Sequence, residues 1–305
     1  MTKPAANPLP QRASASSAQA NLQAMGYMVI AMGAFVCNDT LMKVTSAELP
    51  LGEMIALRGL ISCLIMLPVV ALTCGLMTPF QVYSWPVFIR NIAEIGAAFT
   101  FLSALFHLPM ADVSGVLQAV PLTITAAAAL ILRERVGWRR WTASAAGLVG
   151  VLLIIQPGTT AFSIWYIVAL GAVLCVTTRD LATRFIAKSA PSLAITFITA
   201  LLTTLAGLAM ATTETLVMPS LSALLQLTCA GVLVLIAYHS LIQAMRIGEI
   251  SAIAPFRYSV VLWAMILGFV VFGEIPSAST IIGSMIVIAA GLYTLHREHV
   301  AARQP

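Results

Sequence analysis

Residues 111–141, ADVSGVLQAVPLTITAAAALILRERVGWRRW, align without a gap with residues 251–281, SAIAPFRYSVVLWAMILGFVVFGEIPSASTI, at an offset of 140 positions. Glu134 then falls on Glu274, and apolar residues before Glu134 fall on apolar residues. Both glutamates stand where one long apolar run ends and another begins. Because similar segments at a fixed offset indicate an internal repeat, we expect the two halves of the chain to share one architecture.

The composition indicates that water is not the main solvent of this chain. Hydrophobic residues make up 60% of the 305 residues and charged residues only 9%, and the mean hydropathy is +0.98. Soluble domains are about 25% charged, whereas a membrane-spanning helix needs roughly 20 mostly apolar residues. The formal net charge of +5 does not by itself imply a nucleic acid partner.

Ten apolar runs, separated by Pro, Gly or charged residues, have the character of membrane-spanning helices. We therefore predict an all-α integral membrane protein with ten transmembrane helices, surrounded by a lipid bilayer. The predicted spans are Ala24–Met42, Leu51–Cys74, Val87–Phe106, Ala111–Leu132, Trp141–Ile155, Phe162–Thr178, Ser192–Ala211, Leu221–Met245, Ile250–Phe272 and Ile275–Leu295.

Lys and Arg are distributed unevenly between the two sides of the predicted membrane. If the N-terminal tail lies inside, thirteen of the 16 basic residues lie in or beside inner segments, one lies outside and two lie within spans. Cytoplasmic loops retain positive charge, so we predict that both termini are cytoplasmic. The inner residues are Lys3, Arg12, Arg90, Arg133, Arg135, Arg139, Arg140, Arg179, Arg184, Lys188, Arg246, Arg297 and Arg303; the outer one is Lys43, and Arg58 and Arg257 lie within spans.

The repeat divides the predicted spans into two groups of five. We predict a first five-helix repeat over residues 23–156 and a second over residues 160–296. Because five is odd, the second repeat enters the membrane from the opposite side. Inverted repeats of this kind are typical of transporters that open a central site to each side of the membrane in turn. The architecture therefore favours a secondary transporter that works by alternating access.

The two ends of the chain are predicted to lie outside the spans. Residues 1–22 are rich in Ala, Ser and Pro and lack a continuous apolar core, so we expect a disordered cytoplasmic tail rather than a cleaved signal peptide. A short organellar transit sequence is an alternative that this composition leaves open. Residues 297–305 are predicted to form a second cytoplasmic tail.

Several motifs connect the chain with a known family. ADVSGVLQAVPL, LRERVGWRRW and GLVGVLLIIQPG in the first half, and TRDLATRF and SAIAPFRYSVVLWAMILGFVVFGEIPS in the second, resemble the EamA family of the drug/metabolite transporter superfamily. The resemblance covers nearly the whole chain after the tail. It implies ten helices, a bacterial inner-membrane location and transport of small organic metabolites such as amino acids or vitamins. The chain departs from the common pattern in having Val261 where Pro121 stands in the other half.

Charges within spans are the first candidates for function, because a charge at mid-membrane costs roughly 2.5–3.5 kcal/mol on insertion scales. Asp39 and Lys43 are four residues apart, so they share a helix face and can pair. A functional Asp39 and a simple interfacial ion pair both fit this spacing. Arg58 lies about 10 Å below the outer start of its span, where it can bind a solute or extend to the membrane surface.

The third predicted span carries a second pair with this spacing. Arg90 and Glu94 are four residues apart, and Glu94 lies deep enough that we expect it to be paired or protonated. A functional role and a structural ion pair fit the sequence equally well.

The ninth predicted span carries the most unusual cluster, in which Arg257 and Tyr258 follow Pro255 and Trp263 comes later. Proline kinks a helix and frees a backbone carbonyl, arginine supplies a planar set of donors, and the aromatic rings offer flat apolar faces. These residues can bind a solute, although Arg257 can also reach the lipid headgroups.

Two further polar residues complete the set of candidates. Gln118 in the fourth span holds a place comparable to that of the Arg257 cluster. His239 in the eighth span can relay protons, although a histidine satisfied by its neighbours fits the sequence as well.

Two features are interpreted structurally. Arg179, Asp180 and Arg184 are interpreted as topology signals with a local ion pair. Small residues in the fifth span suit close helix packing, either in the core of the monomer or at the seam of a homodimer. These small residues are Ala143, Ala146, Gly147 and Gly150.

No arrangement typical of an enzyme is present: the sequence lacks HExxH, a phosphate-binding loop and Gly-x-Ser-x-Gly, and its four histidines are scattered. We therefore expect no enzyme activity, cofactor or metal site. A receptor or a membrane-embedded enzyme is the alternative class, but neither would explain an inverted repeat. The expected partner is a small organic solute.

Without a nucleotide-binding motif, the driving force is expected to be a gradient of ions or of the solute. This interpretation places three acids, Asp39, Glu53 and Glu94, at buried or half-buried positions. Protons are a further partner if one of these acids couples their movement to that of the solute. Apolar, aromatic and cationic side chains together suit a zwitterionic or anionic solute.

Overall fold

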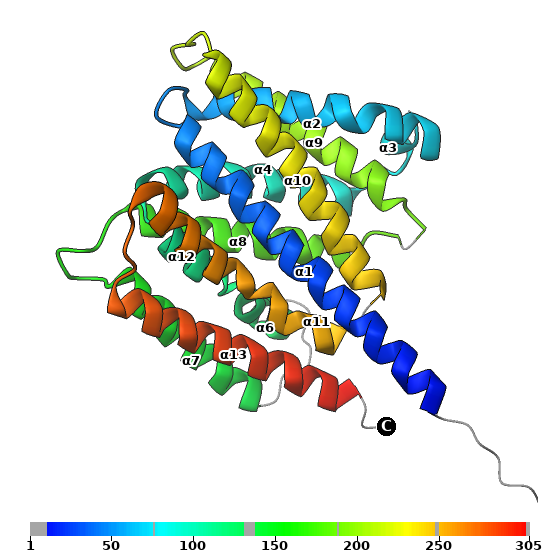
Figure 1. The fold of residues 1–305 in the computed structure, drawn as a ribbon, viewed down its shortest axis with the longest axis vertical. Helices are drawn as coiled ribbons and strands as arrows, with labels where there is room; N and C mark the ends of the chain where they lie inside the picture. Colours follow the sequence, from blue (N-terminus) through cyan, green and yellow to red (C-terminus); the bar gives the residue numbers. More distant parts are fainter. Residues whose placement is uncertain (1–10, 76, 131–137, 188, 248–249, 303–305) are drawn as a thin grey trace, which may run out of the picture.

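The computed structural model describes residues 11–75, 77–130, 138–187, 189–247 and 250–302, which form helices and contain no strand (Figure 1). The helices are α1 (Gln11–Thr45), α2 (Leu51–Thr73), α3 (Thr78–Gln81), α4 (Trp85–His107), α5 (Met110–Leu117), α6 (Val120–Leu130), α7 (Trp138–Ile155), α8 (Trp165–Arg184), α9 (Ser192–Ala211), α10 (Leu221–Ile247), α11 (Ile250–Arg257), α12 (Ser259–Phe272) and α13 (Ala278–Ala302).

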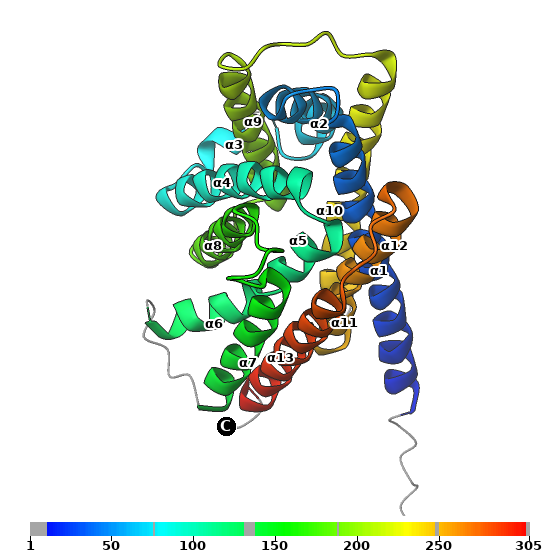
Figure 2. The ribbon, with the colours of Figure 1, turned by 90° about the vertical axis from the view of Figure 1, so that its left-hand side faces the viewer.

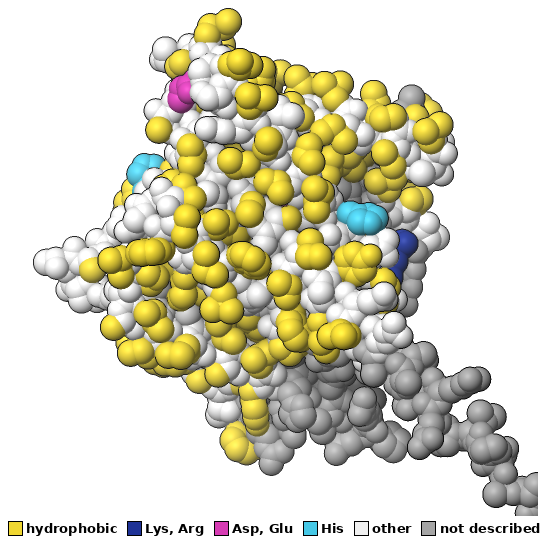
Figure 3. Space-filling view, viewed as in Figure 1, with side chains coloured by type: hydrophobic (Ala, Val, Ile, Leu, Met, Phe, Trp, Pro, Cys, Tyr) yellow, Lys and Arg dark blue, Asp and Glu magenta, His cyan; other side chains and the backbone are white. Residues whose placement is uncertain are grey.

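Eight segments of the described residues are long and apolar enough to cross a membrane. Two shorter apolar helices, Trp141–Ile155 and Ala278–Thr294, lie where the other two spans were predicted. Figure 3 shows one face of the molecule covered with hydrophobic side chains, with charged side chains only near its margins. Such an apolar surface suits lipid rather than water. The prediction of a multi-pass, all-helical membrane protein is confirmed, but the count of ten spans stays a prediction.

Two predicted spans are each broken into two helices. The span over residues 111–132 is broken between α5 and α6, and the span over residues 250–272 is broken at Tyr258, between α11 and α12. At the breaks, the amides of Gln118 and Tyr258 bond to carbonyls three residues back rather than four. Pro121 explains the first break, because it lacks the N–H that would bond to the Leu117 carbonyl. Pro255 lies within α11, where its missing N–H would have bonded to the Ser251 carbonyl, so it does not by itself account for the break at Tyr258.

The offset of 140 positions also holds for the helix boundaries. α11 begins and ends 140 positions after α5, and α13 begins 140 positions after α7. The largest helix contacts are those of α1 with α10, α4 with α8, α2 with α9 and α7 with α13. At this offset α8 is the counterpart of α1, and α10 is the counterpart of α4. The contact between α1 and α10 therefore corresponds to the contact between α8 and α4. Helix bounds and helix packing therefore both follow the repeat.

The small residues of α7 pack inside the monomer. Gly150 and Gly283 bring α7 and α13 so close that a Cβ atom on Gly283 would lie against the Gly150 carbonyl, and one on Gly150 would lie 2.7 Å from the Gly283 carbonyl. Gly147 faces Leu122 and Ala290. The stripe is therefore part of the monomer core at these positions, and only Ala146 is exposed.

The described ends of the chain lie at the same end of the bundle, toward the lower right of Figure 1. We call this the terminal end. The opposite end, which we call the Lys43 end, holds the end of α1 and the loop between α12 and α13 (Figures 1 and 2). Residues 1–10 of the predicted disordered tail lie outside the described residues, and α1 already begins at Gln11. The helical part of the chain therefore starts earlier than the composition predicted.

Candidate functional site

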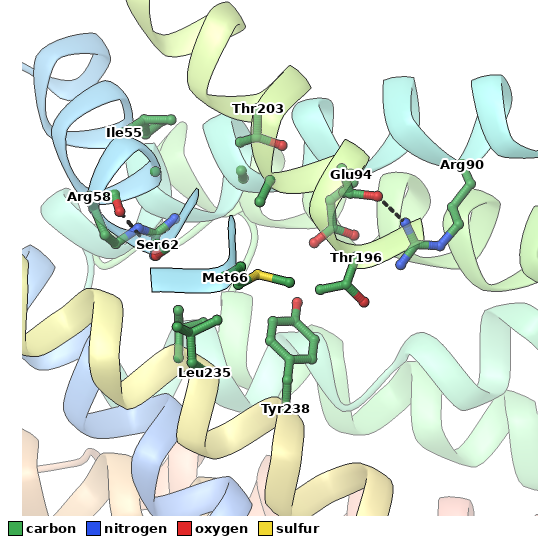
Figure 4. Close-up of a pocket in the computed structure, with 15 residues that line it drawn as sticks. Ile55, Arg58, Ser62, Met66, Arg90, Glu94, Thr196, Thr203, Leu235 and Tyr238 are labelled. Carbon is green, nitrogen blue, oxygen red and sulfur yellow. Dashed lines mark hydrogen bonds between the residues drawn. The ribbon is translucent and has the colours of Figure 1, made fainter. Parts of the chain in front are cut away.

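A cavity of about 120 Å³ lies between α2, α4, α9 and α10, and we call it the central cavity (Figure 4). Its lining combines three charged residues with hydroxyl groups, an aromatic ring and apolar side chains. The lining residues are Ile55, Arg58, Gly59, Ser62, Met66, Arg90, Glu94, Ala98, Thr196, Thr199, Ala200, Thr203, Val234, Leu235 and Tyr238.

Arg90 and Glu94 both line this cavity, but they do not form the predicted pair. Glu94 Oε2 lies 3.1 Å from Nη1 of Arg179 on α8. Arg90 Nη1 instead donates a hydrogen bond of 2.6 Å to the Thr199 hydroxyl, which lies 2.6 Å from Asn91 Oδ1. The ion pair between Arg90 and Glu94, one of the two alternatives that the spacing left open, does not form, because α8 packs against α4 and brings Arg179 to Glu94, a cation that the sequence spacing could not reveal.

Asp39 and Arg58 meet through Asn38. The Asn38 amide donates to Asp39 Oδ1 at 2.9 Å, and its oxygen accepts from Arg58 Nη1 at 3.2 Å. The charges of Asp39 and Arg58 also attract each other. The predicted Asp39–Lys43 pair was wrong: Lys43 bonds to Glu274 instead, because helices distant in sequence pack on each side of α1.

Tyr238 lies at the centre of these charges. Its phenol is within electrostatic reach of Glu94, Arg179, Arg90 and Arg58, and Figure 4 shows its hydroxyl pointing toward the Glu94 carboxylate. Its ring packs edge-on against Phe35 of α1, with the ring centroids 5.1 Å apart. The sequence favoured the neighbouring His239, but that side chain is exposed and lines neither of the cavities described here.

A second cavity, of about 210 Å³, contains the breaks in both interrupted helices, and we call it the terminal cavity. Gln118 lies at one break, and Arg257 and Tyr258 lie at the other. Tyr258 is buried and Arg257 is exposed. The lining residues are Met28, Gln118, Val120, Pro121, Ile124, Thr125, Asp180, Arg184, Leu241, Met245, Ile253, Arg257, Tyr258 and Thr294.

The structure therefore places six of the nine predicted candidates in two cavities, three in each, whereas Asp39, His239 and Trp263 line neither. Trp263 belongs to neither, because its indole ring lies over Gly33 of α1, 3.1 Å from where a Cβ atom would stand. It holds α12 against α1 and is available for packing rather than for binding a solute.

Arg179 links the two cavities. Its Nη1 contacts Glu94 in the central cavity, and its Nε bonds to Asp180 Oδ1 in the terminal cavity at 2.8 Å. Arg179 was interpreted from the sequence as a topology signal with a local ion pair. The bond to Asp180 is such a local pair, but the contact with Glu94 was not predicted. The 140-position offset could have drawn attention to it, since Arg179 falls on the candidate Asp39.

A group of polar bonds joins several segments at the Lys43 end, and we call it the Lys43 clamp. Lys43 Nζ lies 2.6 Å from Glu274 Oε1 and donates to the Leu108 carbonyl at 2.6 Å. The Met110 amide donates to Glu274 Oε2 at 2.8 Å. The clamp thereby ties α1, the α4–α5 turn and the segment after α12 to one another.

Asp112 lies on α5, close to the clamp, and the sequence analysis missed it as a buried acid. Only 6% of its surface is exposed. Tyr166 Oη donates to one carboxylate oxygen at 2.5 Å, and the Thr280 hydroxyl donates to the other at 2.7 Å. The interpretation that named only Asp39, Glu53 and Glu94 as buried acids was therefore incomplete, because Asp112 stands near the start of a span and looked interfacial. Glu53 lines neither cavity and accepts a bond from the Val217 amide.

No group of three or more His, Cys, Asp or Glu side chains in the described ranges is arranged to hold a metal ion. The chemistry that the central cavity offers is therefore recognition by charge and hydrogen bonds. Two guanidinium groups, a carboxylate, hydroxyls and a phenol face a small space inside an apolar bundle. An apolar helical bundle with charged side chains around an internal cavity is typical of a membrane transporter rather than of a purely structural membrane protein.

Comparisons with known proteins agree with this class. Residues 22–156 and 163–295 both match the model of the EamA-like transporter family. The chain belongs to that family.

Two characterised relatives and one solved structure are similar to the chain. An S-adenosylmethionine uptake transporter of Rickettsia prowazekii is 27% identical over 193 residues, which span 62% of this chain and 64% of that relative. A riboflavin transporter of Vibrio cholerae serotype O1 is 23% identical, with 93% of this chain and 96% of the relative aligned. A crystal structure matches with a TM-score of 0.63 and 22% identity, covering 92% of this chain and 99% of that one, which supports the fold alone.

Proposed function

We propose that the protein is a secondary transporter that moves a small organic metabolite across the bacterial inner membrane by alternating access. The observation that carries this proposal is the central cavity, where Arg58, Arg90 and Glu94 face an internal space between helices from both halves of the chain. Charged residues within membrane spans are costly to insert and commonly mark the pathway of a solute or ion. The family membership supports the same conclusion.

The architecture that we propose for this function is two inverted five-helix repeats, residues 23–156 and 160–296, with ten spans and both termini in the cytoplasm. The common offset of helix bounds and the exchange of helix contacts support the repeat. In this arrangement the terminal cavity faces the cytoplasm and the Lys43 clamp closes the other side. Alternating access then requires the clamp to open when the terminal end closes.

The substrate is proposed to be an amino acid, a vitamin or a related solute. The named relatives carry S-adenosylmethionine and riboflavin, which are both small organic metabolites. The two guanidinium groups in the central cavity favour a solute with an acidic or strongly electron-rich group. The apolar lining around Met66 and Leu235 suits a body with little charge.

A transport screen in liposomes tests the proposal. Purified protein would be reconstituted, and the uptake of amino acids, nucleosides, S-adenosylmethionine and riboflavin would be measured separately, with and without a pH gradient. At least one solute should enter only when the protein is present, and its flux should fall in Arg90→Gln. Arg246→Gln is the matched control, because Arg246 is exposed and lines neither cavity.

No flux of any solute, in protein shown to be folded and inserted, would contradict the transport function and favour a receptor-like role. The same assay addresses proton coupling through Glu94, since coupled transport would respond to the pH gradient in the wild type and not in Glu94→Gln. A homodimer, if it forms, must use a surface other than the buried Gly147 and Gly150 positions.

A further inference from the structure

The charged side chains in and beside the central cavity are matched in number. Three guanidinium groups and three carboxylates, connected by hydrogen bonds, by ion pairs and through Tyr238, form one network whose formal charges sum to zero. The network consists of Asp39, Arg58, Arg90, Glu94, Arg179 and Asp180. A carrier with a balanced network can change its orientation in the membrane without an accompanying ion, because no uncompensated charge crosses the apolar interior.

The bonds within this network are not equally satisfied. Arg179 contacts two carboxylates, Glu94 and Asp180. Arg90 contacts none in the part of the chain that the structure describes, and its one hydrogen-bond partner is the Thr199 hydroxyl. A guanidinium offers five N–H donors in a planar fork, so Arg90 keeps free donors beside the cavity.

Glu94 has the complementary free capacity. Its Oε2 is held by Arg179, and its Oε1 accepts no hydrogen bond among the described residues. Glu94 stands one helical turn from Arg90 on the same face of α4. The cavity therefore presents an unpaired cation donor and a free carboxylate oxygen next to each other.

Two neutral groups add to this arrangement. Thr203 lines the cavity and is 9% exposed, and its hydroxyl has no hydrogen-bond partner in the described part of the chain. Tyr238 directs its hydroxyl toward the same space (Figure 4). A buried hydroxyl without a partner is unfavourable, so a bound solute that supplies one would be favoured.

We propose that the central cavity binds a zwitterion of zero net charge, with its anionic group on Arg90 and its cationic group on Glu94 Oε1, and that the protein moves this solute without net charge. This inference rests on the proposed transport function. A neutral zwitterion fills both free positions and leaves the network balanced, whereas a net anion or cation would not. Glu94 then acts as the partner of the solute's cation rather than as a proton carrier.

Three matched solutes test the inference in liposomes that contain the purified protein. L-methionine carries both charges on an unbranched apolar tail, 3-(methylthio)propylamine carries only the cation, and 4-(methylthio)butanoate carries only the anion. Wild-type protein should move L-methionine and neither single-charge analogue. A potassium diffusion potential of about 100 mV should leave the accumulation of L-methionine unchanged, although it would shift that of a solute carried with one net charge roughly fiftyfold.

Two charge-neutralising variants should each gain flux of one single-charge analogue, a result that a damaged fold would not give. Arg90→Gln leaves the network with one excess negative charge, so it should lose L-methionine flux roughly tenfold or more and gain flux of 3-(methylthio)propylamine. Glu94→Gln should lose L-methionine flux similarly and gain flux of 4-(methylthio)butanoate. Arg246→Gln should behave as the wild type.

The outcomes separate the two proposals. Transport of riboflavin or a nucleoside without L-methionine, a flux driven by the potential, or equal loss of all three probes in folded variants would overturn the zwitterion inference and leave the transport function standing. No flux of any solute would overturn both.

Discussion

The Lys43 clamp and the central cavity use the same chemistry in opposite ways. In the clamp, Lys43 holds a carboxylate and a carbonyl at 2.6 Å, and both oxygens of Glu274 are occupied. In the cavity, among the described residues, Arg90 has one hydroxyl partner and Glu94 Oε1 accepts no hydrogen bond. Charged groups whose hydrogen-bonding atoms are occupied tie helices together, whereas charged groups with unoccupied donors or acceptors remain available to a solute. The clamp thus explains how helices are held together at one end of the bundle, and the cavity explains which groups can meet a solute.

The largest expected effect comes from breaking the centre of the cavity network with Arg179→Gln. This change removes the cation that Glu94 and Asp180 share at a partly buried position, so two hydrogen bonds between charged groups are lost, each contributing roughly 1.5 kcal/mol. We expect a clear fall in melting temperature in detergent and loss of transport. The double variant Arg179→Gln with Glu94→Gln should recover part of the stability.

Arg246→Gln serves as the control for this prediction, because it removes an exposed arginine from the end of α10. A melting temperature for Arg179→Gln equal to that of the control would show that Arg179 is hydrated and that the network does not hold α4 to α8.

The next largest effect is expected beside the clamp, at Asp112. Asp112→Leu removes the acceptor of both the Tyr166 and Thr280 hydroxyls, and a buried donor without a partner costs about 1–3 kcal/mol. We expect a lower melting temperature, measured by the fluorescence of the tryptophans on heating. Combining Asp112→Leu with Tyr166→Phe should cost less than the sum of the two separate changes, because the phenol would no longer be left unpaired. Strict additivity would contradict the bond.

A smaller effect is expected from opening the clamp itself. Glu274→Gln removes the charge that holds Lys43, and a partly exposed ion pair contributes on the order of 1 kcal/mol. In a variant without native cysteines, Met110→Cys should react roughly fivefold faster with a water-soluble maleimide when Glu274→Gln is also present. Exposed Ser220→Cys should react at the same rate in both backgrounds, and an unchanged rate at position 110 would show that the clamp does not close this end.

The smallest effect on stability is expected at Thr203. Its hydroxyl has no partner, so Thr203→Val should change the melting temperature little while it weakens solute binding by a few-fold. Saturation of flux with increasing solute concentration measures the second effect. A large loss of stability would mean that the hydroxyl has a structural partner.

Much of the fold could be predicted from the sequence because membrane helices are defined locally. Apolar runs predicted the helices, and the offset of 140 positions predicted which helices share their boundaries. The breaks at Gln118 and Tyr258 were not located, although Pro121 and Pro255 indicated that backbone hydrogen bonds would be lost nearby.

The candidate site could be predicted only in part, because sequence spacing reveals partners on one helix and not on its neighbours. Arg58, Arg90 and Glu94 were found as charges within spans, and all three line the central cavity. The partner of Glu94 could not be predicted from the spacing, since Arg179 comes from α8. Tyr238 was passed over in favour of His239, because only packing shows which of two adjacent residues faces inward.

Protection of the central cavity by a solute tests the account most directly. In a variant without native cysteines, Thr203→Cys and Ser220→Cys would be labelled separately with a maleimide in liposomes, with and without a saturating transported solute. The account predicts slower labelling at position 203 and no change at position 220, which lies in the α9–α10 loop. Equal labelling at position 203 with and without the solute, at concentrations that saturate flux, would contradict the placement of the binding site in the central cavity.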